Sequence, residues 1–164
     1  MAVESFTTKE HGAMTKGGVI GDRTLIVVYN NGRVPRIAAV PRMVLVRPSQ
    51  VHQNRLKLEA PEMDSIEFNV PTTGQVATFQ LYEKTMSGID CGDEVAAWLT
   101  KFMKVDSARL IFHAPNLPAR ESSLFVKFGH LGVYSKKLNL VFQYGSPFNM
   151  ISQASIDDLN KKNG

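Results

Sequence analysis

Hydrophobic and polar residues follow a strand-like pattern over the first half of the chain. The continuous apolar run at residues 25–29 (LIVVY) ends at the Asn-Asn-Gly sequence of residues 30–32, where Asn and Gly tolerate the positive φ of a tight turn. A second apolar run at residues 42–47 (RMVLVR) is closed by Pro48. Each run is short enough for a buried strand, so the pattern predicts two strands here.

Apolar and polar residues alternate in the segments that follow. The apolar positions are Leu56, Leu58, Ile66, Phe68, Val70, Ala77, Phe79 and Leu81. A period of two places successive side chains on opposite sides of a sheet, which is typical of half-buried strands. Residues up to about 88 are therefore expected to form a β-meander or a small barrel.

The hydrophobic period changes from two to a helical one at Asp90. The apolar residues of this segment are spaced i, i+3, i+4, i+7 and i+8, at Val95, Trp98, Leu99, Phe102 and Met103. This spacing puts them on one stripe of a helix. Asp90 is predicted as the N-cap and Asp93 as an acid in the first turn, where the helix dipole favours negative charge.

Strand character returns after this helix, and the chain ends on a second helix. Strands are predicted at residues 109–113, 124–128 and 138–142, with a proline-containing loop at 114–123. Near the C-terminus, Ser155 is predicted as an N-cap and Asp158 as the N3 residue of a capping box. Ile156 and Leu159 would give this helix one apolar edge.

These elements together predict a β-rich α+β fold with two regions. Residues 1–88 form the barrel-like region, and residues 89–164 form an α/β segment that contains both helices. A length of 164 residues with 43% hydrophobic content fits one globular domain, or one domain and part of another.

The charge distribution is uneven along a chain whose net charge is +4. No Asp or Glu occurs from residue 24 to 58, and the basic residues of that window are Arg33, Arg36, Arg42, Arg47, Arg55 and Lys57. Gathered together, they would suit phosphate, nucleic acid or an anionic membrane. No aromatic stacking motif accompanies them, which favours solvent-side or edge-strand positions and argues against nucleic acid as a partner.

Cysteine and histidine usage excludes several site classes. Cys91 is the single cysteine, so neither an internal disulfide framework nor a Cys-rich zinc module is possible. The four histidines, His11, His52, His113 and His130, show no metal-ligand spacing. A helix start could activate the Cys91 thiol, but a small buried hydrophobic side chain is the favoured interpretation.

The sequence also lacks the common signals for targeting and catalysis. No apolar run approaches the roughly 20 residues of a membrane-spanning helix, and the polar N-terminus lacks the apolar core of a secretory signal. Dinucleotide, P-loop, HExxH, CxxC and GxSxG motifs are absent. No catalytic residue and no metal ligand is therefore assigned.

Two turns remain as candidate binding elements. In Gly-Asp-Arg at residues 21–23, Arg23 stands at the mouth of a strand, where a guanidinium can bind phosphate or carboxylate with two hydrogen bonds. In Gly-Ser-Pro at residues 145–147, Gly145 allows close approach of the backbone to a ligand, and the hydroxyl of Ser146 can donate.

Five stretches in order along the chain carry a resemblance to a known family. GDR, PRMVL, DCGDEVAAWLTKFM, RLIF and SPF-x-x-IS-x-AS-x-x-DLN resemble the MOSC proteins, in particular the mitochondrial amidoxime-reducing component and its relatives. The resemblance extends from about Gly12 to Asn160. It implies a MOSC N-terminal β-barrel domain followed by the beginning of the MOSC domain.

This resemblance also implies an activity and its partners. Full-length relatives are oxidoreductases that use the molybdenum cofactor (molybdopterin) to reduce N-hydroxylated compounds, with electrons from a cytochrome b5-type donor. A mitochondrial location is implied, with a cytoplasmic one as the alternative.

Site residues are implied by the matching positions. Arg23 matches the arginine that binds the cofactor phosphate, and Gly145 and Ser146 fall on the loop that lines the cofactor pocket. The metal-binding cysteine of the family normally follows the Asp-Leu-Asn segment, and Cys91 does not match it. We therefore expect this chain alone to be a truncated, inactive portion that does not bind the cofactor.

A different class of function stays open. The family usually has an aspartate where Tyr144 stands and an arginine where Ala38 stands. These departures favour a free-standing, non-catalytic binding module that would use its basic residues on an anionic ligand or a protein partner.

Overall fold

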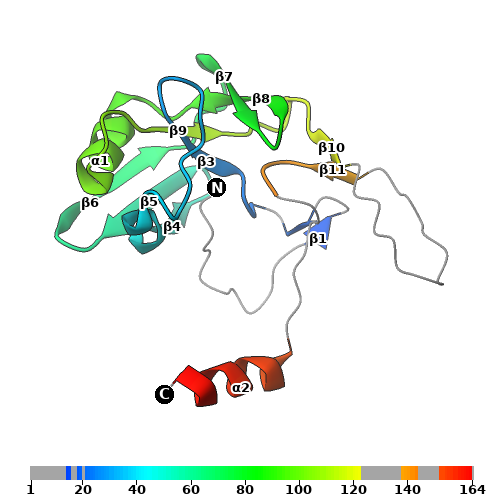
Figure 1. Ribbon diagram of the computed structural model, residues 1–164. Coiled ribbons are helices and arrows are strands. Elements are labelled where there is room, and N and C mark those ends of the chain that lie inside the picture. Colours follow the sequence, from blue (N-terminus) through cyan, green and yellow to red (C-terminus); the bar gives the residue numbers. More distant parts are fainter. Residues whose placement is uncertain (1–13, 16–17, 20, 123–137, 144–151, 164) are drawn as a thin grey trace.

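The computed structural model describes residues 14–15, 18–19, 21–122, 138–143 and 152–163 (Figure 1). The strands are β1 Met14–Thr15, β2 Gly18–Val19, β3 Leu25–Val28, β4 Arg47–His52, β5 Arg55–Ala60, β6 Met63–Asn69, β7 Val76–Leu81, β8 Lys84–Asp90, β9 Arg109–Phe112, β10 Arg120–Ser122 and β11 Leu138–Leu140. The helices are the 3-10 helix η1 Pro41–Leu45 and the α-helices α1 Asp93–Met103 and α2 Gln153–Asn163.

Two antiparallel sheets make up most of the described fold. The larger has the strand order β3-β9-β8-β7, and the smaller has the order β4-β5-β6. Two further antiparallel pairs are β1-β2 and β10-β11. Both main sheets are open in the part of the chain that the structure describes, and the predicted β-rich α+β class is confirmed. The division of the chain after residue 88 stays a prediction.

The larger sheet is buried on both faces, which explains the continuous apolar run in β3. Leu25 and Val27 point to the main core, where α1 packs, and Ile26 and Val28 point to a second cluster that includes Phe79. Alternating side chains of one strand thus enter two separate cores.

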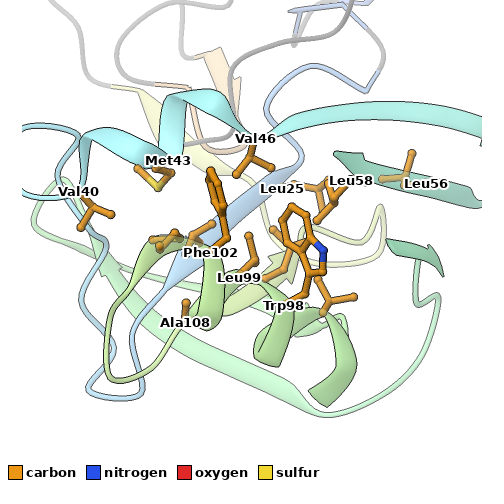
Figure 2. Packing of buried hydrophobic residues seen from close by; sticks show 14 residues of the cluster. Leu25, Val40, Met43, Val46, Leu56, Leu58, Trp98, Leu99, Phe102 and Ala108 are labelled. Atoms are coloured by element: carbon orange, nitrogen blue, oxygen red, sulfur yellow. The ribbon is translucent and has the colours of Figure 1, made fainter. Parts of the chain in front are cut away.

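Helix α1 contributes the largest side chains of the main core. The predicted stripe is confirmed, since Val95, Trp98, Leu99, Phe102 and Met103 are all buried. These side chains pack against β9, β6 and η1. Figure 2 shows Trp98, Leu99 and Phe102 together with Met43, Val46 and Leu58. The helix therefore joins the two main sheets through one shared core.

The predicted strand at residues 42–47 is wrong. Pro41 opens the 3-10 helix η1, where its fixed φ is favourable and its missing N–H costs nothing. Met43 and Val46, three residues apart, are buried, while Val44 is 59% exposed. This period of three is that of a 3-10 turn, and an apolar run does not distinguish it from a strand.

The strand that follows begins only at Arg47. It contains Pro48, which pairs with Leu58 of β5 instead of closing a strand. β4 is an edge strand of its sheet, and proline is tolerated at an edge because its missing N–H need not enter the ladder.

Asp90 is not the N-cap of α1. Gly92 holds that position with a φ of 101°, and Asp90 is the last residue of β8. The Asp90 carboxylate instead accepts a hydrogen bond from the backbone N–H of Gly92 at 2.8 Å. The prediction of Asp93 as a first-turn acid is confirmed.

The start of α2 also differs from the prediction. The helix begins at Gln153, and the hydroxyl of Ser152 accepts from the backbone N–H of Ser155 at 3.2 Å. Ser155 therefore lies inside the first turn and is not the N-cap. The capping serine stands three residues earlier than expected, because Ser152 and Ser155 both suit the motif.

Strand predictions after α1 are confirmed in part. β9 and β11 lie within the predicted segments 109–113 and 138–142, and segment 124–128 lies outside the described residues. The predicted loop at 114–123 is wrong over β10, since Arg120–Ser122 pair with Leu138–Leu140. β10 pairs with β11, which lies far along the chain, so the sequence of β10 alone carries no alternating pattern that indicates a strand.

Candidate functional site

The predicted Arg23 lies in a tight turn immediately before β3. Gly21 and Arg23 both have positive φ, at 86° and 51°. The hydroxyl of Thr24 donates to the carbonyl oxygen of Gly21 at 3.2 Å, which closes the turn. The Arg23 guanidinium lies 3.5 Å from the Asp22 carboxylate, and the Arg23 side chain is 21% exposed. Its cationic group can therefore still be reached from solvent.

The turn is joined to a segment more than a hundred residues away by the side chain of Gln143. Gln143 is 2% exposed. Its Nε2 donates to the carbonyl oxygen of Asp22 at 3.4 Å, and its Oε1 accepts from the backbone N–H of Val141 at 2.6 Å. Gln143 directly precedes the stretch that contains Gly145 and Ser146, which lie outside the described residues.

One further side chain and one backbone N–H complete this polar junction. Arg120 of β10 donates to the carbonyl oxygen of Gln143 at 2.5 Å, and its guanidinium lies 5.1 Å from the centre of the Tyr82 ring. Burial lowers the pKa of Arg120. The backbone N–H of His113 donates to the carbonyl oxygen of Thr24 at 2.8 Å. We refer to Asp22, His113, Arg120 and Gln143 as the turn junction.

Sequence reasoning missed Gln143 and Arg120. The one available signal for Gln143 was a polar side chain at the end of the apolar run LVF, at residues 140–142. A polar residue in that position must find hydrogen-bond partners if it is buried. Nothing in the sequence indicates that its partner is the carbonyl oxygen of Asp22.

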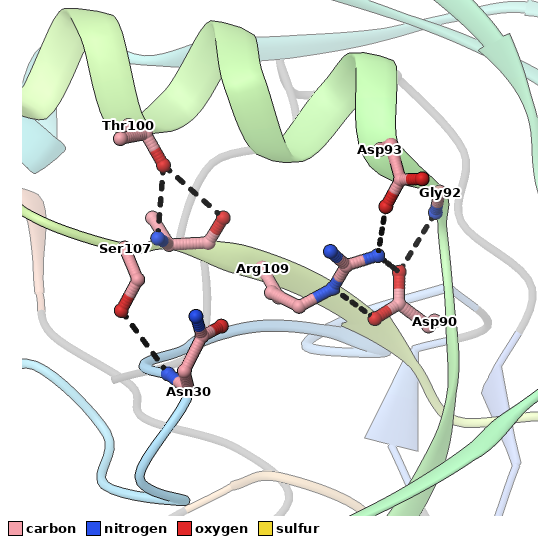
Figure 3. A network of polar contacts seen from close by, with 8 residues as sticks. Asn30, Asp90, Gly92, Asp93, Thr100, Ser107 and Arg109 are labelled. Atoms are coloured by element: carbon pink, nitrogen blue, oxygen red, sulfur yellow. Dashed lines mark hydrogen bonds and ion pairs between the residues drawn. The ribbon is translucent and has the colours of Figure 1, made fainter.

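A second polar cluster fixes the start of α1 (Figure 3). Arg109 of β9 binds Asp90 through two of its nitrogens, and its Nη2 also lies 2.9 Å from the Asp93 carboxylate. The hydrogen bond to Asp90, the largest contribution, raises the pKa of Arg109. These residues line a cavity of ≈ 300 Å³ with Tyr29 and Thr78. Because the ionic groups bind one another across β8, β9 and α1, the cluster orients these elements.

The family follows from a match that covers more than half of the chain. The profile described as "MOSC N-terminal beta barrel domain" matches residues 2–106. The chain belongs to this MOSC family. The match covers β1 to β8 and all of α1, and therefore both main sheets except β9.

Several curated proteins are similar to this MOSC chain. Mitochondrial amidoxime reducing component 2 of Rattus norvegicus is 31% identical over 147 residues, which cover 88% of this chain and 42% of that protein. The protein of the same name from Homo sapiens is 26% identical over 150 residues, covering 90% and 43%. The chain thus spans less than half the length of these relatives.

One solved structure is also similar. It is the solution structure of a protein from Bordetella bronchiseptica, 22% identical, with a TM-score of 0.47 over 54% of this chain and 71% of that chain.

The environment of Cys91 opposes an activated thiol in this MOSC chain. Cys91 is partly buried beside the main core. Burial, and next the negative charge of Asp90, raise the pKa of the thiol to about 12. A thiol with this pKa stays protonated at neutral pH, whereas nucleophiles and metal ligands need the thiolate. Among the described residues, no group of three or more His, Cys, Asp or Glu side chains is placed to hold a metal ion.

Cys91 is therefore expected to react slowly with a thiol reagent, such as an aromatic disulfide that releases an acidic thiol. At pH 8 the native chain should react at least tenfold more slowly than the chain unfolded in urea, because only a minute thiolate fraction forms below a pKa of about 12. Because the pKa of the thiol is higher in the folded state than in the unfolded state, Cys91 contributes to the free energy of unfolding at neutral pH. This contribution is lost as the pH rises from about 9 towards 12. Equal rates in both states would contradict this placement.

Three of the six basic residues in the window at residues 24–58 lie close to glutamates. Arg55 lies 2.9 Å from Glu67, and Lys57 lies 2.7 Å from Glu59. Arg42 lies 4.0 Å from Glu62, with its guanidinium 4.8 Å from the centre of the Phe102 ring. Arg55 and Lys57 of β5 therefore fit the interpretation as solvent-side charges of a sheet.

Within the described part of the chain, no helix combines the length and apolar character needed to cross a membrane.

Proposed function

We propose that this chain supplies the barrel-like region, residues 1–88, and the beginning of the MOSC domain, residues 89–164, of a molybdenum-cofactor oxidoreductase. The observation that carries the proposal is the hydrogen bond from Gln143 to the carbonyl oxygen of Asp22. It joins the turn of Arg23 to the segment that leads into Gly145 and Ser146. The three residues proposed to contact the cofactor therefore belong to two connected segments.

Arg23 fits the role of a phosphate-binding residue by its chemistry. A guanidinium has five N–H donors, so it can bind a phosphate with two hydrogen bonds while it contacts Asp22. The turn junction holds the backbone of residues 22–24 through Gln143 and His113. Gly145 and Ser146 are proposed to contribute close backbone approach and a hydroxyl donor to the same cofactor.

The metal side of the cofactor does not fit the described residues. A molybdenum ion in such a cofactor needs a soft thiolate. The single cysteine of the chain is a protonated thiol in its folded environment. We therefore propose that the 164-residue chain alone does not hold molybdenum and that none of its described residues is catalytic.

The activity, donor and location of the whole protein are proposed by similarity. Relatives are named mitochondrial amidoxime reducing components. We propose that the protein reduces N-hydroxylated compounds, receives electrons from a cytochrome b5-type donor and acts in mitochondria. The names of the relatives support the reduction and the location.

The substitution Arg23→Gln tests the phosphate role directly. In the natural protein that contains this chain, we expect it to lower the pterin retained per protein by at least about tenfold, because hydrogen bonds to a charged group contribute about 1.5 to 3 kcal/mol. Pterin is measured by fluorescence after oxidative release. Arg33→Gln removes an exposed arginine elsewhere and serves as the matched control. The same pterin content in both variants would exclude Arg23 from the cofactor site.

A further inference from the structure

A groove separates α1 from the β5–β6 hairpin, and none of its lining residues belongs to the turn junction. Its volume is ≈ 630 Å³. Met63 and Ile66 of β6 and Trp98 of α1 form its apolar floor. The indole Nε1 of Trp98 donates to the carbonyl oxygen of Asp64 at 2.6 Å, which fixes the orientation of the ring. The floor is thus a pre-formed apolar surface.

The rim of the groove is acidic, although the chain as a whole is basic. Glu62, Asp64 and Glu94 lie on the rim, and Lys101 is its one basic residue. All four are exposed. Three carboxylates against one lysine leave the rim negative, although the Arg42 guanidinium also lies 4.0 Å from the Glu62 carboxylate. An occupant with positive charge is therefore favoured by its electrostatic complementarity.

We propose that this groove binds an extended basic segment of a partner protein. An apolar side chain of the segment packs on Trp98, and Lys or Arg side chains on either side of it pair with Glu62, Asp64 and Glu94. Neighbouring side chains of an extended segment point to opposite sides, but the long Lys and Arg side chains beside the apolar residue can bend back to the rim carboxylates. The proposal does not depend on cofactor binding.

Trp98 is the only tryptophan of the chain, so tryptophan fluorescence reports directly on the groove. The full chain is titrated with the acetylated and amidated peptide Lys-Leu-Lys-Leu-Lys while tryptophan emission is recorded. We expect a saturable change that weakens as salt is added, because exposed ion pairs are screened. The peptide Glu-Leu-Glu-Leu-Glu is expected to cause no such change.

Matched variants test whether the rim carboxylates are responsible. The double variant Glu62→Gln and Glu94→Gln is expected to weaken peptide binding about fivefold, since two exposed pairs contribute roughly 1 kcal/mol in total. The control double variant Glu83→Gln and Asp106→Asn removes the same charge from exposed positions outside the groove. It should leave the affinity within about twofold, the size of a non-specific charge effect.

Three outcomes would overturn the proposal. The first is no saturable emission change with the basic peptide. The second is equal weakening by the groove variant and the control variant, which would indicate only the overall charge. The third is binding of spermine as tight as that of the peptide, because spermine carries the positive charges without the apolar side chains that the groove floor would select.

Discussion

Replacing Phe102 by alanine is expected to lower the free energy of unfolding by about 3 to 5 kcal/mol, the usual range for a large aromatic residue in a core. Phe102 is 2% exposed and stacks on Trp98 with a distance of 5.9 Å between ring centres. It also lies beneath the guanidinium of Arg42. The substitution would leave a cavity where α1 meets η1, and urea unfolding followed by circular dichroism measures the loss.

The exposed residue Val44 of η1 provides the control for Phe102. Val44→Ala should change the free energy of unfolding by no more than about 0.5 kcal/mol, because substitutions at exposed positions have small effects. Similar losses for the two variants would mean that Phe102 is not in the core shared by the two sheets.

Gln143→Leu is expected to destabilise the fold by about 2 to 3 kcal/mol. Leucine matches the size of glutamine but removes the partners of the Val141 N–H and the Asp22 carbonyl, and unsatisfied buried groups cost about 1 to 3 kcal/mol each. The same unfolding measurement applies. Amide hydrogen exchange at residues 22–24 is expected to become faster, since the link that holds the turn is lost.

Gln80→Leu serves as the comparison for Gln143→Leu. Gln80 is an exposed glutamine of β7 whose amide donates to the hydroxyl of Thr85 at 2.9 Å. Water can replace that partner, so the cost should stay below about 1 kcal/mol. If Gln80→Leu were as destabilising as Gln143→Leu, the buried junction would have no special role in holding the turn.

The fold was predictable where the hydrophobic pattern is local and long. The stripe from Val95 to Met103 repeats over more than two turns, which only a helix satisfies. Alternation in β5 and β7 likewise indicates strands without knowledge of their partners. The run at residues 42–47 was ambiguous because apolar content alone does not distinguish a strand from η1, and β10 was missed because its partner β11 is distant in the chain.

Of the described residues at the candidate site, the sequence predicted only Arg23. Arg23 stands out because it directly precedes a strong strand. Gln143 and Arg120 were missed, since their hydrogen-bond partners are set by the tertiary fold. For Cys91 the sequence offers two opposing effects, the helix dipole and burial, and only the packing of its surroundings decides in favour of burial.

Molybdenum and pterin content of the native protein tests the central proposal most directly. The protein is captured from its source cells, grown with molybdate, by an antibody raised against this chain, and both components are measured per protein. We predict stoichiometric molybdenum and pterin in the captured protein and neither in the separately produced 164-residue chain. A captured native protein that contains neither molybdenum nor pterin would contradict the assignment to a molybdenum-cofactor oxidoreductase.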